Sequence, residues 1–175
     1  MLSLQIRIFN HRKMLLNKIK TELFCCVAAG LLLSSCGGKE FVYHENIPVK
    51  GEIWRMENPL SFQFPITDTA TVYLVGLNVR YTLNYPMQNL YVFLHTTFPN
   101  NMQTSDTISV NLFSKDGTPF GSGNRIKELD VPIAKIRFPQ RGQYHIQMEQ
   151  GMRKNELEGV VSMGFYVLKK SGAEN

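Results

Sequence analysis

Apolar and polar side chains alternate along most of the chain after its first fifty residues. In 71–81, Val75 and Leu77 fall on one side of an extended chain, while Asn78 and Arg80 fall on the other. A period of two is typical of strands that bury one face. The pattern predicts strands in 53–56, 62–66, 71–81, 90–94, 107–112, 134–138, 144–148 and 161–167.

The segments between these strands are short and rich in turn residues. Asp116-Gly117 predicts a hairpin turn of type I′, in which both central residues have a positive φ. Asn124 is placed to cap a single helical turn at 125–129, and 151–159 is expected to be a polar connection with a short helix. Many short strands with few helices predict an all-β fold, an antiparallel, jelly-roll-like β-sandwich.

The first part of the chain has a different pattern. An apolar run at 23–33 follows Lys18 and Lys20 and leads into Leu33-Ser34-Ser35-Cys36. A basic flank, a short apolar run and two small residues before a cysteine are typical of a bacterial lipoprotein signal. The run is shorter than the roughly 20 residues needed to span a bilayer. The pattern predicts a signal peptide at 1–35, with a true start possible at Met14, and lipid attachment at Cys36.

Composition and charge must be judged for the mature part of the chain, after this signal has been removed. We expect 36–50 to form a lipidated N-terminus and tether, 51–170 the β-sandwich domain and 171–175 a disordered tail. The formal charge of +5 for the whole chain falls to about +1 for the mature part, because most of the surplus Lys and Arg precede Cys36. The basic pI is therefore no argument for nucleic acid as a partner. Cys36 is the only mature cysteine, which excludes a disulfide within the domain.

Several short motifs resemble those of one known family. These are Asn78-Val79-Arg80-Tyr81, Tyr85-Pro86, Asn89-Leu90-Tyr91, Gly142-Gln143-Tyr144-His145-Ile146, Gln150-Gly151-Met152-Arg153 and Leu157-Glu158-Gly159-Val160. Together with the position of the lipid-attachment motif, they resemble the gliding-motility lipoprotein GldH family of the Bacteroidetes. The resemblance extends over essentially all of the mature chain. It departs from the pattern at Phe120, where the family usually carries a tryptophan.

The resemblance implies a role in gliding motility or the associated protein secretion machinery, through protein–protein contacts. It implies no catalytic residues. The expected partners are envelope proteins and, through the lipid anchor, a membrane; no nucleic acid or small-molecule substrate is expected. We expect the protein on the outer membrane and facing the periplasm, because only Lys39 and Glu40 stand where surface-exported lipoproteins carry an acidic cluster.

The sequence contains no constellation of residues that predicts catalysis or metal binding. The mature histidines, His44, His95 and His145, lack the spacing of metal ligands, and the serines lack a nucleophile motif. We therefore expect no catalytic residues, no metal and no cofactor, and an enzyme is the least favoured class.

The residues that match the family pattern without being needed for a core are Arg80, Asn89 and Arg153. Arginine is enriched at protein interfaces, so Arg80 or Arg153 is a candidate for partner contact, while the competing role is that of an internal strut. The alternative function is a glycan-binding outer-membrane lipoprotein. It would need exposed aromatic side chains in a row, for which the candidates are Tyr43, Trp54, Tyr85, Tyr91 and Phe120.

Overall fold

The computed structural model describes residues 40–170 of the 175-residue chain. The predicted signal peptide, the predicted lipid-attachment residue Cys36 and the tail at 171–175 lie outside the described residues. The elements are β1 Phe41–Pro48, a short 3-10 turn η1 Lys50–Glu52, β2 Ile53–Arg55, β3 Leu60–Ile66, β4 Tyr73–Thr82, β5 Asn89–Thr97, β6 Gln103–Asn111, β7 Ile126–Ile136, β8 Gly142–Gln150, β9 Glu156–Glu158 and β10 Val160–Lys169.

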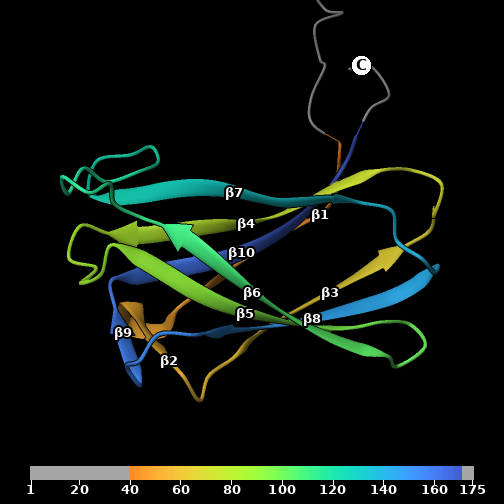
Figure 1. Ribbon diagram of the computed structural model, residues 1–175, viewed down its shortest axis with the longest axis horizontal. Coiled ribbons are helices and arrows are strands. Elements are labelled where there is room, and N and C mark those ends of the chain that lie inside the picture. The colour runs from red at the N-terminus through yellow and green to blue at the C-terminus, as the bar shows by residue number, and fades with distance from the viewer. Residues whose placement is uncertain (1–39, 171–175) are drawn as a thin grey trace, which may run out of the picture. The chain divides into compact units, whose positions relative to one another are not determined.

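Two four-stranded antiparallel sheets form the body of the described unit (Figure 1). The first sheet has the order β1-β10-β4-β7 and the second has the order β3-β8-β5-β6. Strands that follow one another in the chain mostly alternate between the sheets, and this order is that of a jelly roll, two interlocked Greek keys. The short pair β2-β9 lies beside them. The prediction of an all-β, jelly-roll-like sandwich is confirmed.

The core lies between the two sheets and follows from the alternation in the sequence. On β4, Leu77 and Val79 are fully buried, and their partners across the first sheet include Phe165 and Met163 of β10. On the second sheet, Phe62, Phe64, Leu90, Val92, Tyr144 and Met148 are each at most 1% exposed. Each buried side chain of this size contributes about 1.5–3 kcal/mol to folding, so these faces hold the sandwich together.

An aromatic cluster fills one end of the core. The ring of Phe64 stacks on Tyr144 with centroids 5.9 Å apart and on Phe165 with centroids 5.6 Å apart. Phe138 meets both Phe64 and Tyr144 edge-on. Offset and edge-to-face pairs of this kind are worth about 0.5–1.5 kcal/mol each beyond their buried area.

Three local predictions are wrong. Residues 41–48 of the expected tether form strand β1, which pairs with β10 from Phe41 to Pro48. The expected helical turn at 125–129 is the start of the extended strand β7, and β9 lies in the connection expected to hold a short helix. In both cases the chain follows the alternating pattern of a strand. Leu129 alternates with polar neighbours, and Leu157 lies between two glutamates.

The turn at Asp116-Gly117 also differs from the prediction. Only Gly117 has a positive φ (85°), and its N–H donates to the Ser114 carbonyl. A type I′ turn needs positive φ at both central residues, so this turn is of another type. The Asp116 side chain instead accepts hydrogen bonds from the Ser114 and Thr118 hydroxyl groups, and these lower its pKa.

Strand β5 lies between β8 and β6, as expected for a central strand, but only one of its faces is buried. Leu90, Val92 and Leu94 face the core, whereas Tyr91 and Phe93 are 43% and 38% exposed on the outer face of the second sheet. In the part of the chain that the structure describes, no helix is long and apolar enough to cross a membrane.

Candidate functional site

The outer face of the first sheet carries a continuous band of polar side chains. The register places Asn46 of β1, Gly164 of β10, Asn78 of β4 and Asp130 of β7 in one row across four strands. The next row contains Pro48, Ser162, Arg80 and Glu128. We call these two rows the polar face. Its side chains point away from the core because they alternate along β4 and β10 with the buried apolar residues.

Hydrogen bonds connect the β4 and β7 side of the polar face. The Asn78 amide donates from Nδ2 to Asp130 Oδ1 at 2.8 Å and to Glu128 Oε1 at 3.1 Å. The second carboxylate oxygen of Glu128 lies 3.8 Å from Arg80 Nε. The side chains of Arg80 and Glu128 are 40% and 52% exposed, so this ion pair contributes about 0–1 kcal/mol to stability.

Four polar atoms in the polar face are buried and have no hydrogen-bond partner among the described residues. They are Asn46 Oδ1, Asn78 Oδ1, Arg80 Nε and Ser162 Oγ. All four come from adjacent positions on β1, β10 and β4. A buried polar group without a partner costs about 1–3 kcal/mol, so a fold does not gather four of them in one place for stability. Their position on three adjacent strands sets this part of the sheet apart, because native folds leave few such groups unpaired.

Small residues form the floor of this surface. A Cβ built on Gly164 would lie 1.8 Å from Asn46 Oδ1 and 3.0 Å from the Asn78 Cβ, so both side chains lie against this glycine. On the neighbouring row, a Cβ on Gly76 would lie 2.2 Å from the Tyr166 hydroxyl oxygen. Tyr166 is 5% exposed, and burial together with the negative charge of Asp130 raises its pKa. Without glycine at both positions, the side chains of Asn46 on β1 and Tyr166 on β10 could not lie flat against the sheet.

The polar face offers both hydrogen-bond donors and acceptors. The Arg80 guanidinium can donate to carboxylates or carbonyl groups, and the carboxylates of Glu128 and Asp130 can accept. Within residues 40–170, no three His, Cys, Asp or Glu side chains converge to hold a metal ion. The arrangement therefore favours recognition of another polar surface.

The comparisons with known proteins identify the family of the chain. The model of the GldH lipoprotein family matches residues 41–167. The chain belongs to the GldH lipoprotein family. The family match begins at the first residue of β1 and ends near the end of β10, so it spans both sheets of the sandwich.

Two relatives of known name match most of the chain. The gliding motility lipoprotein GldH of Flavobacterium johnsoniae is 28% identical over 153 residues, which cover 81% of this chain and 92% of the relative. The gliding motility lipoprotein GldH homolog of Christiangramia forsetii is 28% identical over 157 residues, covering 85% and 95%. The similarity to the two GldH proteins thus extends over nearly the whole length of each relative.

A solved structure also matches, at a lower level. Dimeric latent PorU from Porphyromonas gingivalis is 10% identical with a TM-score of 0.31, covering 78% of this chain and 14% of that one. A TM-score this low carries no argument about fold or function.

The three residues proposed from the sequence for partner contact do not come together. Arg80 lies in the polar face of the first sheet. Asn89 begins β5 in the second sheet, is half-buried, and its carbonyl accepts a hydrogen bond from the Tyr85 hydroxyl group. Arg153 is exposed in the loop between β8 and β9. Of these residues, only Arg80 belongs to the polar face.

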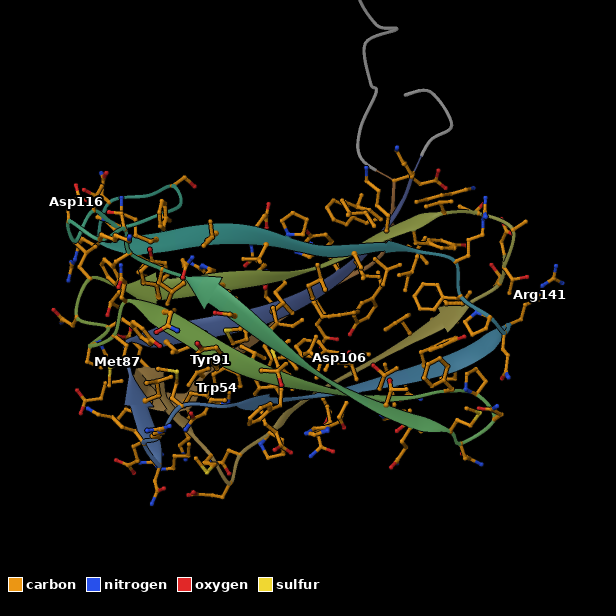
Figure 2. The ribbon with its side chains drawn as sticks, in the orientation of Figure 1. Trp54, Met87, Tyr91, Asp106, Asp116 and Arg141 are labelled. Carbon is orange, nitrogen blue, oxygen red and sulfur yellow. The ribbon has the colours of Figure 1, made fainter. Side chains whose placement is uncertain are left out.

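Among the described residues, the five candidate aromatic side chains do not form an exposed row. Trp54 is 1% exposed and Tyr85 is 4% exposed, so both belong to the core, and the partly buried Tyr43 packs against Phe64. Tyr91 is exposed on the second sheet (Figure 2), whereas Phe120 is exposed in the loop that follows β6. The glycan-binding alternative therefore has no support.

The histidines lie apart from the polar rows. His95 is on the outer face of the second sheet, where Nδ1 is 2.7 Å from the Ser105 hydroxyl oxygen and Nε2 is 3.7 Å from Glu149. His145 lies two strands away from Ser105 on the same sheet, and His44 stacks on Phe41 at the start of β1.

Sequence reasoning missed Asn46, Asn78, Ser162 and the two floor glycines. One signal could have found part of this set. The last strand, Val160–Lys169, is apolar on its core side but has Ser162 and Gly164 on the other, which is unusual for a central strand buried on both faces. Such small residues indicate close approach by something else, here the Asn46 side chain.

Proposed function

We propose that this protein is a lipid-anchored, non-enzymatic envelope protein that supports gliding motility, the associated protein secretion machinery, or both, through protein–protein contacts. The observation that carries the proposal is the pair of relatives named as gliding motility lipoproteins, which align over 81% and 85% of this chain. Residues spread through both sheets fall within the family match, so the whole sandwich is the unit of function.

The anchor is proposed to be Cys36, acylated after removal of 1–35. The Leu33-Ser34-Ser35-Cys36 motif and its basic flank support this, as does the lipoprotein nature of the family. Two or more acyl chains hold a protein firmly on a membrane, because each buried CH₂ contributes about 0.8 kcal/mol. We place the anchor in the outer membrane with the sandwich facing the periplasm.

The contact surface is proposed to be the polar face, with Arg80 as its principal side chain. The partly exposed Arg80 guanidinium and the exposed Glu128 carboxylate support a polar partner here. A partner carboxylate beside the Arg80 guanidinium would form a charge-assisted pair with it. Arg153 is proposed as a second, separate contact in its exposed loop, and Asn89 as a support for the turn that Tyr85 closes.

The test is deletion of the gene in the bacterium that carries it, followed by restoration with single variants. Deletion should reduce colony spreading where the bacterium glides, and should lower the amount of secreted proteins measured by mass spectrometry of the culture medium. The wild-type chain should restore both. Cys36→Ser should fail because the protein no longer reaches its membrane, and Arg80→Glu should fail although it is anchored.

Immunoblots of membrane fractions provide the control, since Arg80→Glu must be present at wild-type abundance for its failure to be informative. A deletion strain with normal spreading and a normal set of secreted proteins would contradict the proposed function. Full restoration by Arg80→Glu at wild-type abundance would show that the polar face is not needed for the proposed function. The role in motility or secretion would still stand.

A further inference from the structure

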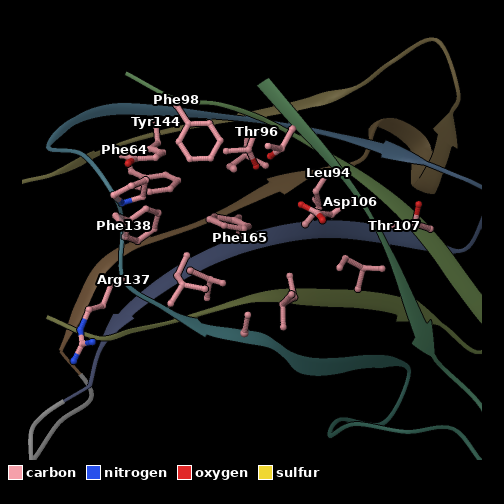
Figure 3. A pocket seen from close by; sticks show the side chains of 18 residues that line it. Phe64, Leu94, Thr96, Phe98, Asp106, Thr107, Arg137, Phe138, Tyr144 and Phe165 are labelled. Atoms are coloured by element: carbon pink, nitrogen blue, oxygen red, sulfur yellow. The ribbon is translucent and has the colours of Figure 1, made fainter. Parts of the chain in front are cut away.

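A cleft of about 640 Å³ opens between the two sheets on the side formed by β6 and β7 (Figure 3). Both strands are edges of their sheets. On the opposite side, β1 lies against β3 and closes the sandwich. The lining is mainly apolar and includes Leu94, Ile108, Ile133, Ala134 and Ile136, with the aromatic cluster at one end. Its polar members are Thr96, Thr104, Asp106, Thr107 and Arg137.

The cleft is a wedge because β6 diverges from the first sheet along its length. At the closed end, the Tyr81 hydroxyl oxygen lies 2.6 Å from the Leu112 carbonyl oxygen and 2.7 Å from that of Phe120. Val110 is 2% exposed there. Toward the start of β6, the inward positions are Asp106 and Thr104, and both are exposed. Along the β6 edge, the side chains of the two sheets therefore meet near Leu112, whereas near Asp106 and Thr104 the edge is open.

Opposite the open end, β7 has an apolar inner face that the described residues cover only in part. Ile133, Ala134 and Ile136 are only partly buried although they belong to the core-facing side. Apolar side chains held half-exposed in a concave site indicate a binding partner, since their burial would add stability at about 25 cal/mol per Å².

The edge of β6 is an open template for another strand. β6 has nine residues, contains no proline or lysine, and keeps an unbroken register with β5 from Gln103 to Asn111. Edge strands usually carry a device that prevents pairing, and here the one present is the inward-pointing charge of Asp106. β7 is a poor template, because Pro132 lacks an N–H and the register with β4 shifts beside it.

The charge of Asp106 restricts the occupant. No described residue forms an ion pair with this carboxylate. An acyl chain in the cleft would leave both the carboxylate and the edge of β6 without partners. A second copy pairing antiparallel through the middle of β6 would bring two Asp106 carboxylates close together, which is unfavourable. An extended segment with apolar side chains at alternate positions and one Lys or Arg would meet all three requirements. It would pair with the edge of β6, pack its apolar side chains in the cleft and place its positive charge beside Asp106.

We propose that the cleft binds an extended segment of another polypeptide, which adds a strand to the free edge of β6, packs alternate apolar side chains on Ile133, Ala134 and Ile136, and sets a Lys or Arg beside Asp106. This site shares no residue with the polar face. It stands or falls independently of the role in motility or secretion.

The test uses the full-length protein in lipid nanodiscs and three labelled synthetic peptides of eleven residues. In the first peptide, valine alternates with threonine and one central valine is replaced by lysine. The second has glutamate in place of that lysine, and the third has the composition of the first without alternation. Fluorescence anisotropy should show that the lysine peptide binds at least about tenfold more tightly than either other peptide.

Three variants locate the site. Asp106→Lys should reverse the preference, so that the glutamate peptide binds more tightly. Ala134→Phe should abolish binding by filling the cleft. Ser109→Lys makes the same kind of change on the same strand but on its outward face, and should leave the preference for lysine intact. Hydrogen exchange should slow for the β6 amides when the lysine peptide is bound.

Any one of the following outcomes would overturn the proposal. The first is the absence of binding by the lysine peptide up to about 1 mM, and the second is equal binding of the alternating and non-alternating peptides. The third is an unchanged lysine preference in Asp106→Lys, a test that does not depend on Ala134→Phe folding. The fourth is displacement of the peptide by palmitate together with indifference to Asp106→Lys, which would assign the cleft to an acyl chain. Dimerisation lost in Asp106→Lys would assign it to a second copy.

Discussion

Glycine at position 164 is required by the way Asn46 lies across the first sheet. A methyl group there would come within 1.8 Å of Asn46 Oδ1, although the backbone of β10 is extended and accepts any residue. We expect Gly164→Ala to lower the free energy of unfolding by about 1–3 kcal/mol, the usual cost of overpacking. Urea or thermal unfolding followed by circular dichroism measures this.

The double variant Gly164→Ala/Asn46→Ala supplies the control. Removing the Asn46 side chain clears the space for the new methyl group and removes one buried unpaired oxygen. The double variant should therefore recover most of the lost stability, which is a coupling that independent sites do not show. Additive losses from the two substitutions would contradict the contact between Asn46 and Gly164.

The sequence predicted one residue of the polar face and not its neighbours. Arg80 stood out because it is a charged residue opposite core positions on a strongly alternating strand. Asn46 was assigned to a tether, and Ser162 and Gly164 have no chemistry of their own. They become a site only through the register of β1, β10 and β4, which depends on pairing between residues more than 80 positions apart.

At the level of elements, the connection between β3 and β4 is held by Asp68. Its carboxylate accepts hydrogen bonds from the Thr71 hydroxyl group at 2.5 Å and from the Ala70 N–H at 2.8 Å. The Thr71 bond is the largest cause of a lowered pKa for Asp68. A carboxyl group with a lowered folded pKa stabilises the fold above its unfolded pKa of about 3.9, and this stability is lost as the pH falls through the folded value.

Thr71→Val should remove this bond and move the pKa of Asp68 back toward its usual value. The variant should melt below wild type near pH 7, and the difference should shrink as the pH falls toward about 2, where Asp68 is protonated in both proteins. Thr67→Val, in the same connection, is the control and should show no such pH dependence. A melting difference that stays constant across this range would exclude the Asp68 bond as its cause.

Most strands could be predicted from alternation because the inward side chains are large and apolar. Phe62, Phe64 and Ile66 on β3 and Tyr144, Ile146 and Met148 on β8 are all at most 4% exposed. Strand β1 was missed because its burial is incomplete along its whole length, as an edge strand with no regular period. The cleft could not be predicted either, because it depends on how far β6 diverges from β7.

At the level of the whole molecule, the proposed anchor at Cys36 is open to a direct test. We expect Cys36→Ser to block lipidation and signal removal, because the thiol that accepts the diacylglycerol group is lost. Metabolic labelling with a radioactive fatty acid should mark the wild-type protein and not the variant. Label that persists in Cys36→Ser would place the lipid on another residue or refute lipidation at this motif.

The domain should also fold without a disulfide or a metal, because Cys36 is the only cysteine of the mature chain. The melting temperature of the full-length protein in nanodiscs should be unchanged by reductant and by chelator. A clear decrease with either reagent would contradict this expectation, because it would reveal a disulfide or a metal ion that stabilises the fold.

The central claim is that the anchored protein works through polar contacts made by Arg80. To test it, the tagged full-length chain is cross-linked in native membranes and purified. Quantitative mass spectrometry then measures the proteins that purify with wild type, Arg80→Ala and Arg55→Ala. Arg55 is the matched control, because it also pairs with a glutamate, Glu156 at 2.9 Å, outside the polar face. Melting temperatures of all three should differ little, since exposed ion pairs contribute at most about 1 kcal/mol.

The account predicts that Arg80→Ala loses most of its envelope partners while Arg55→Ala keeps them. A large loss of thermal stability in Arg80→Ala, or a set of partners equal to that of wild type, would contradict it.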